Sequence, residues 1–158
     1  DNKKRHVDIA TRYKKSTDLY LNLMGDAETI PCVKDYQNHL GACLADYTEK
    51  YGMILELCPI GVTEDFNLQY YKKGEGFKTE HCERPGMLNQ TIKRVLVFMT
   101  YLNTVPSGGT KFKYYNHTES AVKGKTIIWP SDWTHTHASQ VTKKHEKIIA
   151  TGWISHIW

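Results

Sequence analysis

Apolar residues follow two different spacings in this chain, one helical and one typical of short strands. Between Val33 and Tyr47 they recur every three or four residues, which predicts a helix of about five turns. Gly52 is a suitable end for that helix. The preceding segment, residues 1–24, is rich in Lys, Arg, Asp and Thr and predicts an extended entry into the fold.

From Asp65 onward, short apolar runs separated by glycine and proline predict strands. The predicted strands cover residues 67–71, 94–102, 110–115, 125–129 and 147–154, and the predicted breaks between them include Pro85-Gly86 and Pro106. Strands do not alternate with helices, which disfavours a parallel α/β sheet. We therefore predict a mainly β fold with N-terminal helices, a double-stranded β-helix of the jelly-roll or cupin-like kind with a helical buttress.

The length of 158 residues fits one domain. We predict a single domain over residues 1–158, with helical support in 1–64 and the jelly-roll core in 65–158. The formal net charge of +4 comes from basic residues that are interleaved with acids along the chain, a pattern typical of a solvated surface and not of a nucleic-acid groove.

Cysteine spacing and hydropathy lead to expectations about the compartment. Cys32, Cys43, Cys58 and Cys82 form no C-x-x-C pair and no dense framework, so we expect reduced thiols in a cytoplasmic protein. No apolar run approaches the roughly 18 to 20 residues of a membrane span. We expect neither a nucleic-acid partner nor a membrane partner, and the oligomeric state is not determined by these patterns.

Three His-x-acid triplets are candidates for a metal pair, although about one would arise by chance in this composition. His6-Val7-Asp8 lies in the charged N-terminal segment, with no strand expected around it. His117-Thr118-Glu119 lies in a polar stretch expected to be a solvated turn. His81-Cys82-Glu83 follows a strand and a glycine-bearing loop, where alternate residues point to one side and can reach one ion. By itself this triplet fits a surface loop equally well.

The C-terminal region adds a third ligand and a cation. His137 and Lys147 stand ten residues apart. Two imidazoles and one carboxylate hold Fe(II) on one face and leave three positions open, and a lysine inside a jelly roll needs an anionic partner such as a dicarboxylate. The alternative is that Lys147 reaches the surface from a strand end. The histidine at 135 is a second candidate ligand, because alternation places it on the same side as His137.

A longer set of motifs resembles the prolyl 4-hydroxylase-like branch of the Fe(II)/2-oxoglutarate dioxygenases. The resemblance covers about residues 65 to 155 and depends on the order and spacing of six elements. These elements are Tyr71-Lys-Lys-Gly-Glu-Gly-Phe77 with His81-Cys-Glu83, then Arg94, Thr100-Tyr-Leu-Asn103, Ser107-Gly-Gly-Thr-Lys-Phe112, Val122-Lys-Gly-Lys125, and His137 with Lys147 and Trp153.

The resemblance implies roles for particular residues. His81, Glu83 and His137 would hold the iron, and Lys147 would pair with the distal carboxylate of 2-oxoglutarate. The family spacing favours His137 over His135 as the distal ligand. The remaining positions implied for the cosubstrate pocket or its surroundings are Tyr71, Tyr101, Thr151 and Trp153.

Two positions depart from the most usual pattern of the family. Glu83 stands where the family usually has Asp, and its extra methylene moves the ligand oxygens outward by about one bond length. Lys147 stands where some relatives have Arg, and it is a compact charge without the bidentate fork.

The activity implied is hydroxylation of a peptidyl proline or a similar side chain, with release of succinate and CO2. The resemblance implies Fe(II), 2-oxoglutarate and O2, with ascorbate as reductant. Two alternatives stay open. One is an oxygenase acting on a free amino acid or another small molecule, and the other is a non-catalytic, cupin-like metal-binding module, which would need neither Lys147 nor Tyr101.

Overall fold

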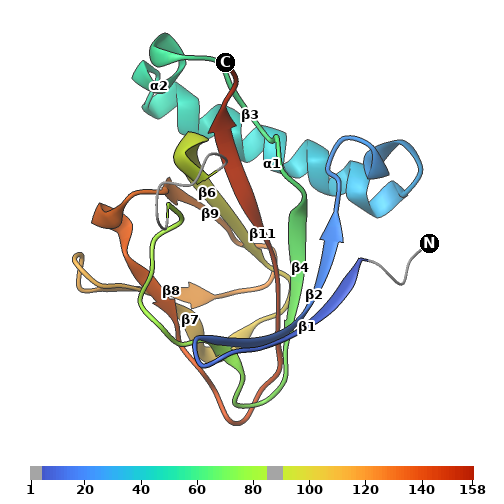
Figure 1. Ribbon diagram of the computed structural model, residues 1–158, viewed down its shortest axis with the longest axis vertical. Coiled ribbons are helices and arrows are strands. Elements are labelled where there is room, and N and C mark those ends of the chain that lie inside the picture. The colour runs from blue at the N-terminus through green and yellow to red at the C-terminus, as the bar shows by residue number, and fades with distance from the viewer. Residues whose placement is uncertain (1–4, 85–90) are drawn as a thin grey trace.

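Two antiparallel sheets and one long helix make up the fold of the computed structural model, which describes residues 5–84 and 91–158 (Figure 1). The helices are α1 (Pro31–Lys50) and α2 (Met53–Leu57), with short 3-10 turns η2 (Asp26–Glu28), η4 (Thr91–Lys93) and η5 (Trp133–His135). The strands are β1 (His6–Ala10), β2 (Lys14–Leu21), β3 (Ile60–Gly61), β4 (Phe66–Tyr71), β5 (Gly76–Phe77), β6 (Arg94–Tyr101), β7 (Val105–Phe112), β8 (His117–Ala121), β9 (Thr126–Pro130), β10 (His137–Ser139) and β11 (Lys147–His156). The mainly β class with a helical buttress is confirmed.

The main sheet has eight strands in the order β1-β2-β4-β11-β6-β9, with β3 added beside β11 and β5 beside β2. The minor sheet has the order β10-β7-β8. Both faces of the main sheet are covered, which explains the continuous apolar sequence of β6. Leu96 and Phe98 pack in the cluster that includes Val33 and Leu40 of α1, whereas Val97, Met99 and Tyr101 pack in the second cluster, with Phe112 of β7 and Ala121 of β8.

The expectation that residues 1–64 are helical support was wrong for the first third of that range. β1 and β2 are strands of the main sheet, and β2 pairs with β4 over Thr17–Leu21. The alternation of β2 was hidden because its buried positions include Ser16 and Asp18, which are polar. Residue 64 therefore does not separate helices from the sheet.

The predicted strand at 110–115 instead begins at Val105 and ends at Phe112. Pro106 looked like a break, but the register of β7 against β8 shifts between Val105 and Thr110, and a bulge accommodates a proline there. Gly109 is required in this segment, since a Cβ built on it would lie 1.9 Å from the carbonyl oxygen of Glu119. The predicted break at Pro85-Gly86 lies outside the described residues.

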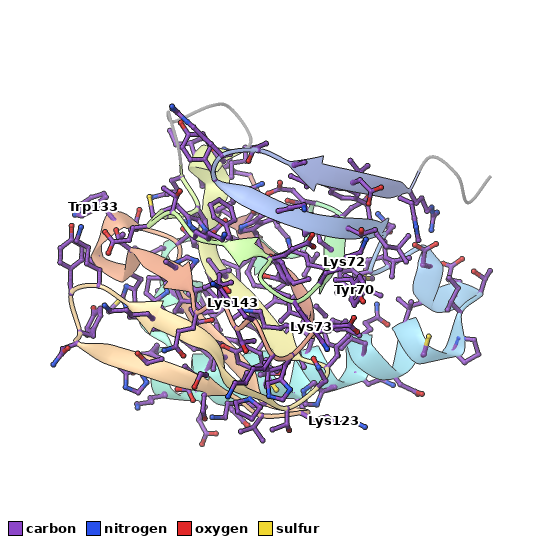
Figure 2. The ribbon with its side chains drawn as sticks, turned by 90° about the horizontal axis from the view of Figure 1, so that it is seen from below. Tyr70, Lys72, Lys73, Lys123, Trp133 and Lys143 are labelled. Atoms are coloured by element: carbon purple, nitrogen blue, oxygen red, sulfur yellow. The ribbon has the colours of Figure 1, made fainter. Side chains whose placement is uncertain are left out.

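The cysteines form no disulfide, and the tryptophans differ in exposure. The four cysteines are all free thiols. Trp129 is a buried packing residue at 5% exposure, whereas Trp133 is 67% exposed and stands at the edge of the molecule (Figure 2). Among the described residues, no helix is long and apolar enough to cross a membrane.

Candidate metal centre

His81 and His137 are brought together by backbone pairing between two segments far apart in the sequence. His81 N donates to the carbonyl oxygen of His137 at 3.0 Å, and His137 N donates to that of His81 at 2.9 Å. Exchange of both hydrogen bonds is the mark of a directly opposed antiparallel pair. Glu83 N donates to the carbonyl oxygen of Ser131 at 3.0 Å, which fixes the third residue on the same side.

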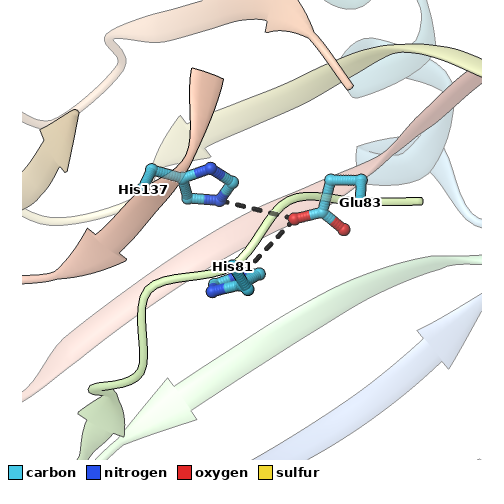
Figure 3. Close-up of side chains that lie close together, drawn as sticks. All are labelled: His81, Glu83 and His137. Carbon is cyan, nitrogen blue, oxygen red and sulfur yellow. Dashed lines mark ion pairs between the residues drawn. The ribbon is translucent and has the colours of Figure 1, made fainter. Parts of the chain in front are cut away.

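The three side chains converge on one point (Figure 3). Nε2 of His81 and Nε2 of His137 each lie 3.4 Å from Oε1 of Glu83. Two ligands at right angles, each about 2.1 Å from an ion, lie about 3 Å apart, so this spacing suits a shared metal. In the part of the chain that the structure describes, this is the one group of three potential ligands close enough to hold an ion.

Backbone carbonyls set the tautomer of both histidines. Nδ1 of His81 lies 2.8 Å from the carbonyl oxygen of Thr79, and Nδ1 of His137 lies 2.9 Å from that of His135. A carbonyl oxygen only accepts, so each Nδ1 carries the proton and donates it. Each Nε2 is then left with a free lone pair for a metal, as is usual for histidine ligands.

Glu83 is oriented by Trp153. The indole Nε1 donates to Oε2 of Glu83 at 2.7 Å, which leaves Oε1 facing the two imidazoles. The guanidinium of Arg94 stacks over the Trp153 ring at 3.5 Å and is itself held by Glu64 at 2.8 Å. Burial alone would raise the pKa of Glu83, but the imidazoles of His137 and His81 beside its carboxylate outweigh burial and hold that pKa well below its usual range. The group is an anion, as a metal ligand must be.

Lys147 is a buried cation, as expected of an interior lysine. It is 5% exposed, and its Nζ donates to the carbonyl oxygen of Gly108 at 2.9 Å and to the hydroxyl of Ser139. Within residues 5–84 and 91–158 no carboxylate forms an ion pair with it. Burial lowers the pKa of Lys147 to about 8. The charge therefore lacks an anionic partner among the described residues, and a carboxylate of a ligand can supply one.

One cavity of about 260 Å³ joins the metal ligands to Lys147. Its volume is close to the lower end of small-molecule pockets, about 300 Å³. Its lining includes, besides those four residues, Tyr71, Phe77, Thr110, Trp129, Ser139, Ile149, Thr151, Trp153 and a group from β2 and β4. Tyr71 lies with its ring 5.3 Å from Lys147 Nζ.

Tyr101 does not lie among the residues that line this cavity. Its buried hydroxyl bonds to Oγ1 of Thr110 at 2.7 Å, and Thr110 is the residue that reaches the lining. Burial raises the pKa of Tyr101 to about 12, so it stays a neutral hydrogen-bonding group. Thr151 lines the cavity while its hydroxyl donates to the carbonyl oxygen of Phe98 at 2.9 Å.

The other two triplets lie elsewhere, on strands that we had not expected. His6 and Asp8 are exposed on β1, and the Asp8 carboxylate accepts a hydrogen bond from Thr17 at 2.6 Å. His117 and Glu119 lie on β8 with Nε2 and Oε2 3.1 Å apart. The side chain of His135 also stays outside the ligand set, with its ring 4.9 Å from that of Tyr115.

Sequence reasoning missed several cavity residues. Phe77, which the sequence had placed only at the end of the motif before the triplet, stacks on the His81 ring with centroids 3.7 Å apart. Ser139 bonds Lys147, and Asp18 and Asn67 are buried in the cavity wall. The only signal for Asp18 and Asn67 was a polar residue at an inward position of a strand, and β2 had not been expected to join the sheet.

Solved structures with similar folds include three prolyl hydroxylases. The viral collagen prolyl hydroxylase of Paramecium Bursaria Chlorella virus-1, in its 2OG complex, is 21% identical with a TM-score of 0.67, over 92% of this chain and 81% of that one. A Pseudomonas putida prolyl-4-hydroxylase is 16% identical with a TM-score of 0.68, over 98% and 79%. A Trichoplax adhaerens prolyl hydroxylase in complex with a hypoxia inducible factor peptide fragment is 14% identical with a TM-score of 0.72, over 96% and 71%.

These likenesses show the jelly-roll fold. No curated protein sequence matches the chain. The sequence model of one family matches residues 66–155, which is more than half of the chain and contains all three metal ligands, Lys147 and Trp153. The chain therefore belongs to the 2OG-Fe(II) oxygenase superfamily.

Proposed function

We propose that this chain is a 2-oxoglutarate-dependent oxygenase that hydroxylates a proline, or a similar side chain, in a peptide. The observation that carries the proposal is that Lys147 is buried in the same cavity as the three candidate metal ligands and forms no ion pair with a described residue. A metal-binding module would need the triad but not the cation. The fold shared with prolyl hydroxylases supports a prolyl substrate.

The residues that line the cavity have different proposed roles at its two ends. His81, Glu83 and His137 would hold Fe(II) on one face and leave the other face open. Lys147 would bind the distal carboxylate of 2-oxoglutarate, with Tyr71 beside it, and Thr110, Ile149 and Thr151 would form the wall between the two ends. When bound, Fe(II) with 2-oxoglutarate and O2 supplies oxidative decarboxylation to succinate and CO2, coupled to insertion of oxygen into a C–H bond.

The protein itself excludes water and fixes charges. Glu83 offsets one charge of the metal, Lys147 offsets one charge of the cosubstrate, and burial keeps both interactions strong. Ascorbate is expected to keep the iron reduced.

The direct test is succinate release with Fe(II), ascorbate, O2 and 2-oxoglutarate, over a panel of prolyl peptides and free amino acids. We expect succinate above the iron-only blank and a mass gain of one oxygen in a prolyl peptide. Succinate with oxidation of a free amino acid alone would replace the peptide substrate by a small molecule. If no succinate forms with any member of the panel, the metal-binding module takes the place of the oxygenase.

A further inference from the structure

A second wall of the cavity, on β2 and β4, has no role in the function described so far. It consists of inward residues Lys14, Asp18 and Tyr20 of β2 and Asn67 and Gln69 of β4. The register pairs Asp18 with Gln69 and Tyr20 with Asn67, so they form two adjacent rows on one face. This wall is polar, although the rest of the sheet interior is mainly apolar.

The carboxylate of Asp18 and the amide oxygen of Gln69 in this wall are already bonded within the protein. The carboxylate of Asp18, which is 0% exposed, binds Lys14 Nζ at 2.6 Å and the hydroxyl of Ser16 at 2.7 Å. Oε1 of Gln69 accepts from the hydroxyl of Tyr71. The buried charge of Asp18 is thus neutralised, and the acceptor of Gln69 is occupied.

Oδ1 of Asn67 differs from these bonded groups. The residue is 5% exposed, and its side-chain oxygen Oδ1 is buried without a hydrogen-bond partner among the described residues. Buried acceptors are almost always bonded, because an unbonded one lowers stability. The register of β4 against β11 places Asn67 directly beside Thr151, which lines the cavity between the metal and Lys147. Asn67, which carries this unbonded acceptor, therefore lines the space next to the expected cosubstrate.

We propose that Oδ1 of Asn67 positions the substrate by accepting a hydrogen bond from a neutral N–H group next to the residue that is oxidised. A neutral donor fits because the one carboxylate of this wall is already paired with Lys14. Proline has no N–H of its own in a peptide, so the donor comes from a neighbouring backbone amide or from a neighbouring side-chain amide. This inference rests on the proposed peptide substrate.

The first experiment replaces the acceptor by an apolar group of similar size, Asn67→Leu, with Asn38→Leu on the exposed face of α1 as a matched control. We expect the thermal midpoint of Asn67→Leu to equal or exceed that of the parent, because an unbonded buried acceptor is removed. Affinity for 2-oxoglutarate should stay the same, and KM for a hydroxylated prolyl peptide should rise about tenfold, equivalent to about 1.4 kcal/mol. Asn38→Leu should match the parent in thermal midpoint, affinity for 2-oxoglutarate and peptide KM.

The second experiment identifies the donor with the peptide acetyl-Ala-Gln-Pro-Ala-Ala-amide and two derivatives. One derivative replaces the N–H that follows proline by an ester oxygen, and the other replaces glutamine by leucine. The derivative that lacks the true donor should show a KM about tenfold higher with the parent and no further loss with Asn67→Leu.

Three results would overturn the proposal or its basis. A lower thermal midpoint of Asn67→Leu with unchanged peptide KM would make Asn67 structural. If a derivative lowers turnover by the same factor in the parent and in Asn67→Leu, the N–H that it lacks does not bond to Asn67. If the parent protein hydroxylates no peptide, the proposed function itself is wrong. This result is obtained with the parent alone, before any Asn67 variant is compared.

Discussion

The triplets His81-Cys82-Glu83 and His117-Thr118-Glu119 have the same spacing, and in each the imidazole Nε2 lies close to the carboxylate, at 3.4 Å and 3.1 Å. Their surroundings differ. Glu83 is 13% exposed and meets the imidazole of His137, whereas Glu119 meets Lys125 Nζ at 2.5 Å and stands beside an imidazole that is 57% exposed. A lysine ammonium repels a cation that a second imidazole would bind. The third neighbour, and not the spacing, distinguishes the triplet that could hold a metal ion from the one that could not.

The largest difference between the two triplets should appear on removing a histidine. His137→Ala takes one of three ligands and should abolish stoichiometric Fe(II) binding and turnover. His117→Ala should leave both unchanged. Iron content of the purified, reconstituted variants measures the effect, and equal iron loss in both would mean that the exposed triplet shares in metal binding.

Removal of the cation next to each site sharpens the comparison. Lys147→Met should weaken 2-oxoglutarate binding by on the order of 2 to 4 kcal/mol, because a buried charge-assisted contact is lost, with little change in metal affinity. Lys125→Met removes the cation that pairs with Glu119 and should leave cosubstrate affinity as it was. Calorimetric titration with 2-oxoglutarate under anaerobic conditions measures both. Unaltered affinity in Lys147→Met would exclude the assigned role.

The hydrogen bond that orients Glu83 has no equivalent at Glu119 among the described residues, where Lys125 and His117 are the partners. Trp153→Phe keeps the ring beneath Arg94 but removes the indole N–H donor. Loss of such an orienting partner typically lowers metal affinity about 10- to 100-fold. Competition with a chelator of known affinity measures this change, and an unchanged affinity would show that the two imidazoles alone fix the carboxylate.

The pH dependence of cosubstrate binding follows from the pKa of Lys147, which burial lowers to about 8 in the folded protein from its ordinary value of 10.5. Lys147 is charged below pH 8, so 2-oxoglutarate affinity should be constant there and fall by up to about tenfold per unit above it. Between about pH 8 and 10.5 only the unfolded chain holds this proton, so this residue makes ligand-free protein more stable as pH rises. A binding curve flat to pH 10 would contradict the lowered pKa.

The smallest effect should come from His135→Ala. The Nδ1 proton of His137 is held by the backbone carbonyl of residue 135 and not by its side chain, so the substitution keeps that hydrogen bond. Iron should remain bound, with at most a severalfold change in peptide KM. Collapse of iron stoichiometry in this variant, with His137→Ala intact, would reverse the assignment of the distal ligand.

Elements with a local pattern could be predicted from the order of residues alone. The spacing of apolar residues in α1 and the β-rich runs of β4, β6, β9 and β11 each agree with the structure, because side-chain periodicity reports directly on which face is buried. The motifs around His81, Glu83, His137 and Lys147 likewise identified the residues that converge, since their order and spacing belong to the family that the comparison identifies.

Other features depend on neighbours that are distant in sequence, so they follow from strand pairing and packing and could not be predicted from local patterns. The alternation of β2 was not recognised because its buried positions include the polar residues Ser16 and Asp18. Both can be buried because the Asp18 carboxylate accepts hydrogen bonds from Lys14 and from the Ser16 hydroxyl. The place of β2 in the sheet follows from its pairing with β4. Tyr101 proved to stand behind Thr110, and Asn67 to face the cavity, because strand register and not spacing sets which side chain reaches a shared space. The residue pattern of a strand predicts which of its faces is buried. The residues that complete a site on that face come from another segment of the chain, which the pattern does not identify.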